Sequence, residues 1–140
     1  MGSYKNLLVW KEARILTHMV YDMIRFLPKE EIYCLSAQMR RAVVSIGSNI
    51  AEGAGRGSTQ DYMHFLYIAR GSAYELETQL VYCDDLDFMS KDFSDKLHHQ
   101  VAKVIYLINR LMDAMKKNTS YEFREDVTPY GFHEEQPEEP

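Results

Sequence analysis

The stretch from Cys34 to Tyr62, CLSAQMRRAVVSIGSNIAEGAGRGSTQDY, decides the fold. Its apolar residues recur at steps of three and four, the spacing of one face of an α-helix; they are Leu35, Met39, Val43, Ile46 and Ile50. Three glycines within residues 53–57 then interrupt the pattern, because glycine makes helix continuation costly and opens positive φ angles. Ser58, followed by Asp61, is a start signal for another helix. The stretch therefore predicts a helix, a tight glycine turn and a second helix.

Helical spacing continues on both sides of this stretch. The apolar residues predict helices over residues 9–26, from 31 or 34 to 52, from 58 to about 83, and from 90 or 92 to 117. The first helix ends before Pro28, since the residue preceding a proline is disfavoured in helical geometry. Short connections between four such segments predict an all-α fold, an antiparallel up-down-up-down four-helix bundle.

The last two predicted helices, at about 27 residues, are longer than the first two, and the mismatch amounts to roughly 12–15 Å at ~1.5 Å per residue. One hairpin would therefore overhang the other and need a partner to bury its apolar groups. The candidates for that burial are Tyr74, Tyr82, Phe88 and Tyr106. The length mismatch predicts a homo-oligomer. Within the third helix, Gly71 predicts either a close approach by another backbone or a kink.

Composition and charge bound the class of protein. A chain of 140 residues with 46% apolar residues fits one domain with a real core. No apolar run approaches the ~20 residues that span a membrane, and the start of the chain lacks a signal-peptide layout, so we expect a cytoplasmic protein without a membrane partner. Cys34 and Cys83 are expected to be buried thiols, too far apart for a disulfide.

The formal net charge of −5 is unevenly distributed. Residues 118–140 carry seven acidic residues and one arginine, whereas residues 1–117 carry 15 basic and 14 acidic residues. We therefore divide the chain into a bundle domain, 1–117, and an acidic C-terminal tail, 118–140. Large apolar groups interrupt the acids of the tail, namely Tyr121, Phe123, Val127, Tyr130 and Phe132. The tail is interpreted either as a flexible acidic segment or as one that docks on a neighbouring subunit or covers a basic surface.

Catalytic and metal-binding patterns are weak. His98 and His99 are adjacent, so they point about 100° apart on a helix and cannot bind one metal together. The acidic run at residues 84–87 lacks the glycine and terminal glutamate of an EF-hand and is interpreted as a solvated loop. We predict no catalytic residue, no metal site and no cofactor, and hence a protein that is not an enzyme.

Several short motifs resemble the "four helix bundle protein" family. They are Arg40-Arg41, Ser45-Ile46, Asn49-Ile50-Ala51-Glu52-Gly53, Tyr62, Phe65, Ala69-Arg70-Gly71-Ser72 and Glu75-Leu76. That family includes proteins encoded in intervening sequences of 23S rRNA genes and, more distantly, the accessory variability proteins that work with reverse transcriptases in diversity-generating retroelements. The resemblance covers residues 4–117. It implies the same bundle, commonly a pentameric ring, and a partnership with nucleic acid or with a nucleic-acid enzyme.

Polar residues of the second helix and its surroundings have two interpretations. A structural network would join the helices and fix their register; its members are Arg41, Ser45, Asn49, Glu52 and Glu75. Basic residues would instead contact phosphates of RNA or DNA; the candidates are Arg56, Arg40, Arg70, Lys11 and Arg14, with Arg56 in the glycine turn as the strongest. The alternative function is a protein–protein interaction scaffold without a nucleic-acid role, which the acidic overall charge favours.

Overall fold

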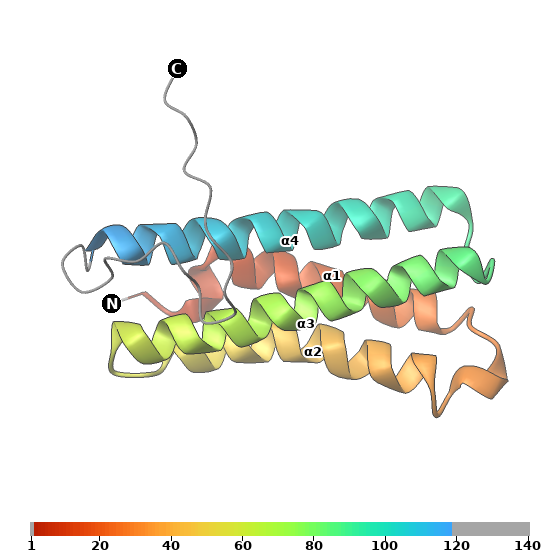
Figure 1. Ribbon diagram of the computed structural model, residues 1–140, viewed down its shortest axis with the longest axis horizontal. Helices are drawn as coiled ribbons and strands as arrows, with labels where there is room; N and C mark the ends of the chain where they lie inside the picture. Colours follow the sequence, from red (N-terminus) through yellow and green to blue (C-terminus); the bar gives the residue numbers. More distant parts are fainter. Residues whose placement is uncertain (1, 119–140) are drawn as a thin grey trace, which may run out of the picture.

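The computed structural model describes residues 2–118, which form four α-helices and two short 3-10 helices (Figure 1). The α-helices are α1 (Leu8–Ile24), α2 (Leu35–Ala54), α3 (Thr59–Asp85) and α4 (Lys91–Asn118), and the 3-10 helices are η1 (Tyr4–Asn6) and η2 (Lys29–Glu31). Consecutive helices run in opposite directions (Figure 1). The α1–α2 and α3–α4 connections lie at one end of the bundle, and the α2–α3 turn lies at the other. The predicted all-α four-helix bundle is confirmed. The acidic tail lies outside the described residues.

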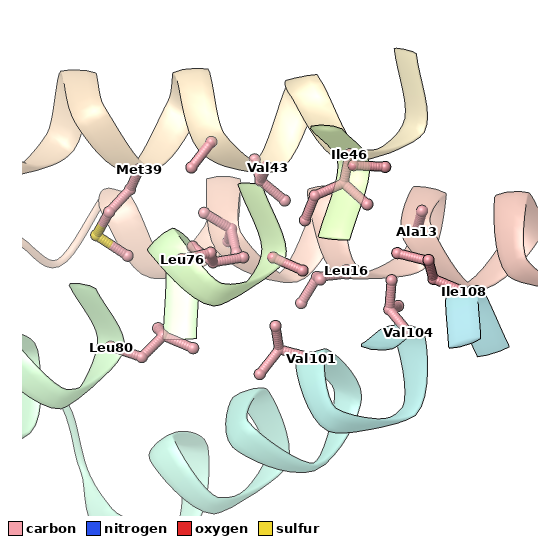
Figure 2. Close-up of a cluster of buried hydrophobic side chains, with 14 of the residues drawn as sticks. Ala13, Leu16, Met39, Val43, Ile46, Leu76, Leu80, Val101, Val104 and Ile108 are labelled. Atoms are coloured by element: carbon pink, nitrogen blue, oxygen red, sulfur yellow. The ribbon is translucent and has the colours of Figure 1, made fainter. Parts of the chain in front are cut away.

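Side chains from all four helices meet in one apolar core (Figure 2). Each helix packs against the next along the chain, and α1 also packs against α4, so that α1 and α3 lie across a diagonal. The predicted stripe of α2 faces inward, since Met39, Val43, Ile46 and Ile50 are fully buried. Leu35 is only partly buried because it is the first residue of α2.

Two serines cap the longer helices. The Ser58 hydroxyl accepts a hydrogen bond from the backbone N–H of Asp61 at 3.1 Å, as the start signal predicts. The Ser90 hydroxyl accepts from the backbone N–H of Phe93 at 3.3 Å, which identifies Ser90, and not Asp92, as the cap of α4. Both serines satisfy donors that would otherwise lack a partner in the first turn of a helix.

The glycines after Ile50 act differently from the predicted turn. Helix α2 continues through Gly53 to Ala54, and no described glycine has a positive φ angle. Gly53 is buried, and a Cβ atom built on it would lie 2.9 Å from Cβ of Phe65 and 3.1 Å from Cδ1 of Tyr62. The missing side chain therefore lets α2 and α3 approach closely. The turn itself needs only Gly55, Arg56, Gly57 and Ser58, between Ala54 and Thr59.

Gly71 lies on an exposed side of α3, which runs through it without interruption. A Cβ atom at this position would meet no heavy atom within 4 Å. The close approach predicted for Gly71 is therefore not found within the described chain. The choice of glycine here has no explanation in the packing of this bundle.

The predicted difference in helix length is present, since α3 and α4 have 27 and 28 residues against 17 and 20 for α1 and α2. The α1–α2 connection, which contains η2, lies at the same end of the bundle as the turn between the longer helices α3 and α4 (Figure 1). Phe88 packs against the core, whereas Tyr74, Tyr82 and Tyr106 are exposed.

Within residues 2–118, no helix is both long and apolar enough to cross a membrane.

The two cysteines differ in environment, and the prediction that both are buried is wrong for Cys34. Cys34 is exposed because it precedes the first residue of α2, outside the inward-facing stripe. Cys83 is buried in the core, where desolvation, followed by the nearby charges of Asp84 and Glu31, raises the pKa of its thiol to about 11. Both are free thiols.

We expect one fast and one slow thiol in this protein. At pH 8, Cys34 should react with a disulfide reagent on mixing, whereas Cys83 should react only when the bundle opens, because the thiolate is the reactive form. Titration with Ellman's reagent with and without denaturant measures the two classes. Cys34→Ser should abolish the fast phase; two fast thiols in the wild type would contradict the burial of Cys83.

Candidate nucleic-acid interface

A shallow groove of about 220 Å³ lies on the surface between α1 and α2. Its lining residues are Trp10, Arg14, Thr17 and His18 of α1, and Val44, Gly47 and Ser48 of α2. The groove exists because small residues face each other here, with the Cβ position of Gly47 only 3.9 Å from Cβ of Ala13. We call this feature the α1–α2 groove.

One basic side chain, that of Arg14, lines the α1–α2 groove, and three more lie within one helical turn of a lining residue. On α1, Lys11 precedes the lining residue Arg14 by three positions. On α2, Arg40 and Arg41 precede the lining residue Val44 by four and three positions. Residues at these spacings share one side of a helix. Lys11, Arg14 and Arg41 are exposed, and Arg40 is partly buried. None of the four forms an ion pair with another residue in the range 2–118. Their positive charge is therefore available to a ligand.

The acidic residues near these helices are turned to other partners. Glu12 points toward α4, where its carboxylate accepts a hydrogen bond from Gln100 at 2.7 Å and lies 3.1 Å from Nζ of Lys103. These two contacts, the hydrogen bond from Gln100 first, lower the pKa of Glu12. Asp22 pairs with Arg25 on the surface at 4.0 Å. The carboxylates therefore do not neutralise the cations around the groove.

Trp10 connects the groove to the core. Its ring is partly buried against the apolar cluster and meets the edge of Tyr4, with 5.4 Å between ring centroids. The guanidinium carbon of Arg14 lies 5.8 Å from the ring centroid, within the range of a cation–π contact. The structure shows that Trp10 packs on the core and also lines the groove.

Arg56 lies in the α2–α3 turn, outside the α1–α2 groove. Its Nη2 atom forms an ion pair with Oε1 of Glu52 at 2.9 Å, and its guanidinium lies over the ring of Phe65 at 4.9 Å. The side chain keeps 48% exposure, so it remains accessible at the surface. Unlike the cations of the groove, it already has a carboxylate partner.

Arg70 occupies a position that its sequence pattern does not reveal. It is only 9% exposed, and its Nη1 atom donates a hydrogen bond to Oδ1 of Asn109 at 3.0 Å across the α3–α4 interface. Its guanidinium also lies over the ring of Tyr67 at 5.1 Å. Arg70 is thus engaged inside the bundle and separated from the other predicted phosphate contacts.

The predicted polar network is divided into smaller sets of contacts. The amide of Asn49 donates to the hydroxyl of Ser45 at 2.9 Å, and Ser72 of α3 donates to the same hydroxyl at 2.8 Å. Glu52 instead pairs with Arg56, and Glu75 accepts a hydrogen bond from Gln79 at 3.3 Å. Arg41, at the exposed surface, has no hydrogen bond within the described part of the chain. Of the predicted network, Ser45 is the one member with a hydrogen bond to another helix among residues 2–118, and its partner is the unpredicted Ser72 of α3.

Asp84 corrects the interpretation of the acidic run as a solvated loop. It remains in α3, where its carboxylate accepts a hydrogen bond from Ser94 at 2.5 Å and lies 2.8 Å from Nε2 of His98. The three side chains connect the end of α3 to the first turns of α4. Across residues 2–118, no group of three or more His, Cys, Asp or Glu side chains is arranged to hold a metal ion.

Comparison with known proteins identifies the family. A family model described as 23S rRNA-intervening sequence protein matches residues 5–110. The chain belongs to that family. The matched range contains all of α1, α2 and α3, and most of α4. It includes every residue of the α1–α2 groove.

A solved structure supports the fold of this 23S rRNA-intervening sequence family member. It is a protein of unknown function from the S23 ribosomal protein family of Bacteroides thetaiotaomicron, with a TM-score of 0.70 and 21% sequence identity. The alignment covers 75% of this chain and 98% of that protein. No curated protein matches the chain. At this identity, the similarity extends to the fold.

Proposed function

We propose that this family member is a non-enzymatic, oligomeric module that binds nucleic acid, or a nucleic-acid-processing partner such as a reverse transcriptase, through the α1–α2 groove. The observation that carries the proposal is the set of four cations without ion-pair partners around a groove that contains Trp10. Cations bind phosphates, and an exposed aromatic or guanidinium face accepts stacked bases.

Oligomerisation strengthens this proposal on electrostatic grounds. Residues 1–117 carry 15 basic and 14 acidic residues, so a single bundle has little net charge to attract a polyanion. Copies arranged around an axis, as in the pentameric ring that the family resemblance implies, would repeat the basic groove and raise the local potential. The exposed tyrosines of α3 and α4, Tyr74 and Tyr106, offer apolar area for contacts between copies.

Replacing both Arg14 and Arg41 by alanine should weaken binding of a labelled single-stranded RNA. The slope of log affinity against log salt should become shallower by about 0.7 for each phosphate that the variant no longer neutralises. Fluorescence anisotropy titrations at several salt concentrations measure both quantities. Both side chains are exposed, so the helical content measured by circular dichroism should not change.

Lys96→Ala provides the matched control, because Lys96 is an exposed lysine on α4, away from the groove. Its substitution should leave RNA affinity close to that of the wild type. If Lys96→Ala lowered RNA affinity as much as the double variant of Arg14 and Arg41 does, the groove would be rejected as the binding surface. Arg56→Ala, at the α2–α3 turn, then measures whether the surface extends beyond the groove.

A protein–protein scaffold is the second candidate function, supported by a different observation. Large apolar side chains are exposed where the α1–α2 connection and the α3–α4 turn meet the end of the bundle, including Phe26, Tyr33 and Leu86 at 75%, 91% and 55% exposure. Exposed apolar groups that gather at one site favour protein contacts. This function would be favoured if the protein captured a protein partner with an affinity that does not change with salt concentration, and did not bind RNA.

A further inference from the structure

We propose that the acidic C-terminal segment, residues 119–140, binds in the α1–α2 groove of its own chain and there competes with nucleic acid. The docking is argued from charge, apolar complementarity and reach, and only the competition rests on the proposed function. The segment contains Glu122, Glu125, Asp126, Glu134, Glu135, Glu138 and Glu139 against a single Arg124. It also contains the aromatic residues Tyr121, Phe123, Tyr130 and Phe132.

The groove and the segment are complementary in two respects. The cations Lys11, Arg14, Arg40 and Arg41 have no carboxylate partner among residues 2–118, while the segment carries a large excess of carboxylates. The groove also presents the apolar surfaces of Trp10 and Val44, and two pairs of aromatic residues, Tyr121 with Phe123 and Tyr130 with Phe132, stand close to acids of the segment. Opposite charge gives orientation and association rate, and buried aromatic groups give affinity. An acidic peptide without aromatic residues would match only half of this surface.

The segment is long enough to reach the groove of its own bundle. Helix α4 ends at Asn118 and packs antiparallel to α1, so the segment starts at the end of the bundle where α1 begins (Figure 1). Trp10 is the third residue of α1. Packed helices are about 8–10 Å apart, whereas a segment of 22 residues extends to roughly 70 Å at ~3.3 Å per residue. The first acidic cluster, residues 122–126, can therefore lie over the groove.

Trp10 is the sole tryptophan of the chain and provides a direct reporter of this docking. In the full-length protein, the triple variant Glu122→Gln, Glu125→Gln and Asp126→Asn should expose Trp10, seen as stronger acrylamide quenching and a red-shifted emission. Added salt should produce the same shift in the wild type, because the Debye length falls from about 10 Å at 0.1 M to about 3 Å at 1 M.

Two further variants locate the effect. The first is a control that combines Glu30→Gln, Asp85→Asn and Asp95→Asn. It removes the same number of exposed carboxylates at the opposite end of the bundle and should leave Trp10 quenching unchanged. The second is Arg41→Glu. Arg41 lies two turns from Ser48 on the groove side of α2, and the substitution should increase the quenching of Trp10, as the triple tail variant does. Unchanged quenching in both the tail variant and Arg41→Glu would overturn the docking.

Mixing two proteins decides whose tail occupies the groove. A Trp10→Phe chain keeps its tail but emits no tryptophan signal, and it is mixed with the triple tail variant. If mixing restores protection of Trp10, the segment comes from another copy and docking within one chain is overturned. If mixing leaves Trp10 as exposed as in the tail variant alone, the intramolecular contact is supported.

The competition has its own readout. The triple tail variant should bind single-stranded RNA several-fold more tightly than the wild type at the same salt concentration. Increased Trp10 exposure with unchanged RNA affinity would leave the docking in place and overturn the competition. Absence of RNA binding by every variant would reject the proposed function while the quenching results still judge the docking.

Discussion

Gly53→Ala should destabilise the bundle by about 1–2 kcal/mol, even though alanine favours helices more than glycine does. The new methyl group would lie 2.9 Å from Cβ of Phe65, 3.1 Å from Cδ1 of Tyr62 and 3.3 Å from the backbone oxygen of Tyr62. Two of these atoms cannot move without shifting the backbone of α3. Overpacking of this kind typically costs about 1–3 kcal/mol, which exceeds the gain of about 1 kcal/mol from helix propensity.

Gly71→Ala is the matched control and should have the opposite sign. The added Cβ atom meets nothing within 4 Å, so the expected result is a gain of about 0.5–1 kcal/mol from helix propensity alone. Urea unfolding followed by circular dichroism gives both free energies. A higher midpoint for both variants would show that Gly53 is not at a close helix contact. A lower midpoint for Gly71→Ala would indicate that another copy covers this side of α3.

The sequence predicted the bundle because its evidence is local. Apolar spacing within each helix identified the buried stripe of α2, and the Ser58 cap located the start of α3 to within a residue. Helix ends were less certain: α1 ends at Ile24, two residues before the prediction, and α2 continues to Ala54, two residues beyond it. Glycine propensity suggested a turn at Gly53, but tertiary packing against α3 kept that residue helical.

The arginines show what local evidence cannot supply. Arg56, the strongest candidate, and Arg70 were both predicted to contact phosphates, yet only Arg70 is buried, where it donates a hydrogen bond to Asn109 of α4. The two residues of that pair are 39 positions apart in the sequence. Asp84 similarly belongs to a contact with Ser94 and His98 that exists only once α3 and α4 pack. Such pairs depend on which faces of two helices meet, and spacing within one helix does not determine that.

Three of the five basic residues named from the sequence lie on the helices that form the α1–α2 groove, whereas Arg56 and Arg70 do not. Of these three, Arg14 lines the groove, and Lys11 and Arg40 lie one helical turn from a lining residue. Gly47 and Ser48, whose small size opens the groove, carried no functional signal because each is unremarkable in a helix. The one sign of the groove in the sequence is that Gly47 and Ser48 face the helix of Trp10. That position becomes apparent only when α1 and α2 are aligned in antiparallel orientation.

Leu16→Ala should destabilise the protein by about 2–5 kcal/mol, the range for deleting a buried leucine side chain. Leu16 has no exposed surface and lies in the cluster to which all four helices contribute (Figure 2). The loss combines the transfer of its methyl groups from an apolar environment with the cavity left between the helices. Because the surrounding side chains are themselves fully buried, they can collapse only partly into that cavity.

The adjacent residue tests whether burial is the cause. Ile15→Ala removes a side chain that is 47% exposed on the same helix, and its effect on the free energy of unfolding should be well below that of Leu16→Ala. Urea unfolding of the two variants, with equal slopes, gives the comparison. Similar losses for both would mean that α1 is rotated relative to the core. Since Arg14 and His18 take their positions from the same rotation, that result would also displace the α1 wall of the groove.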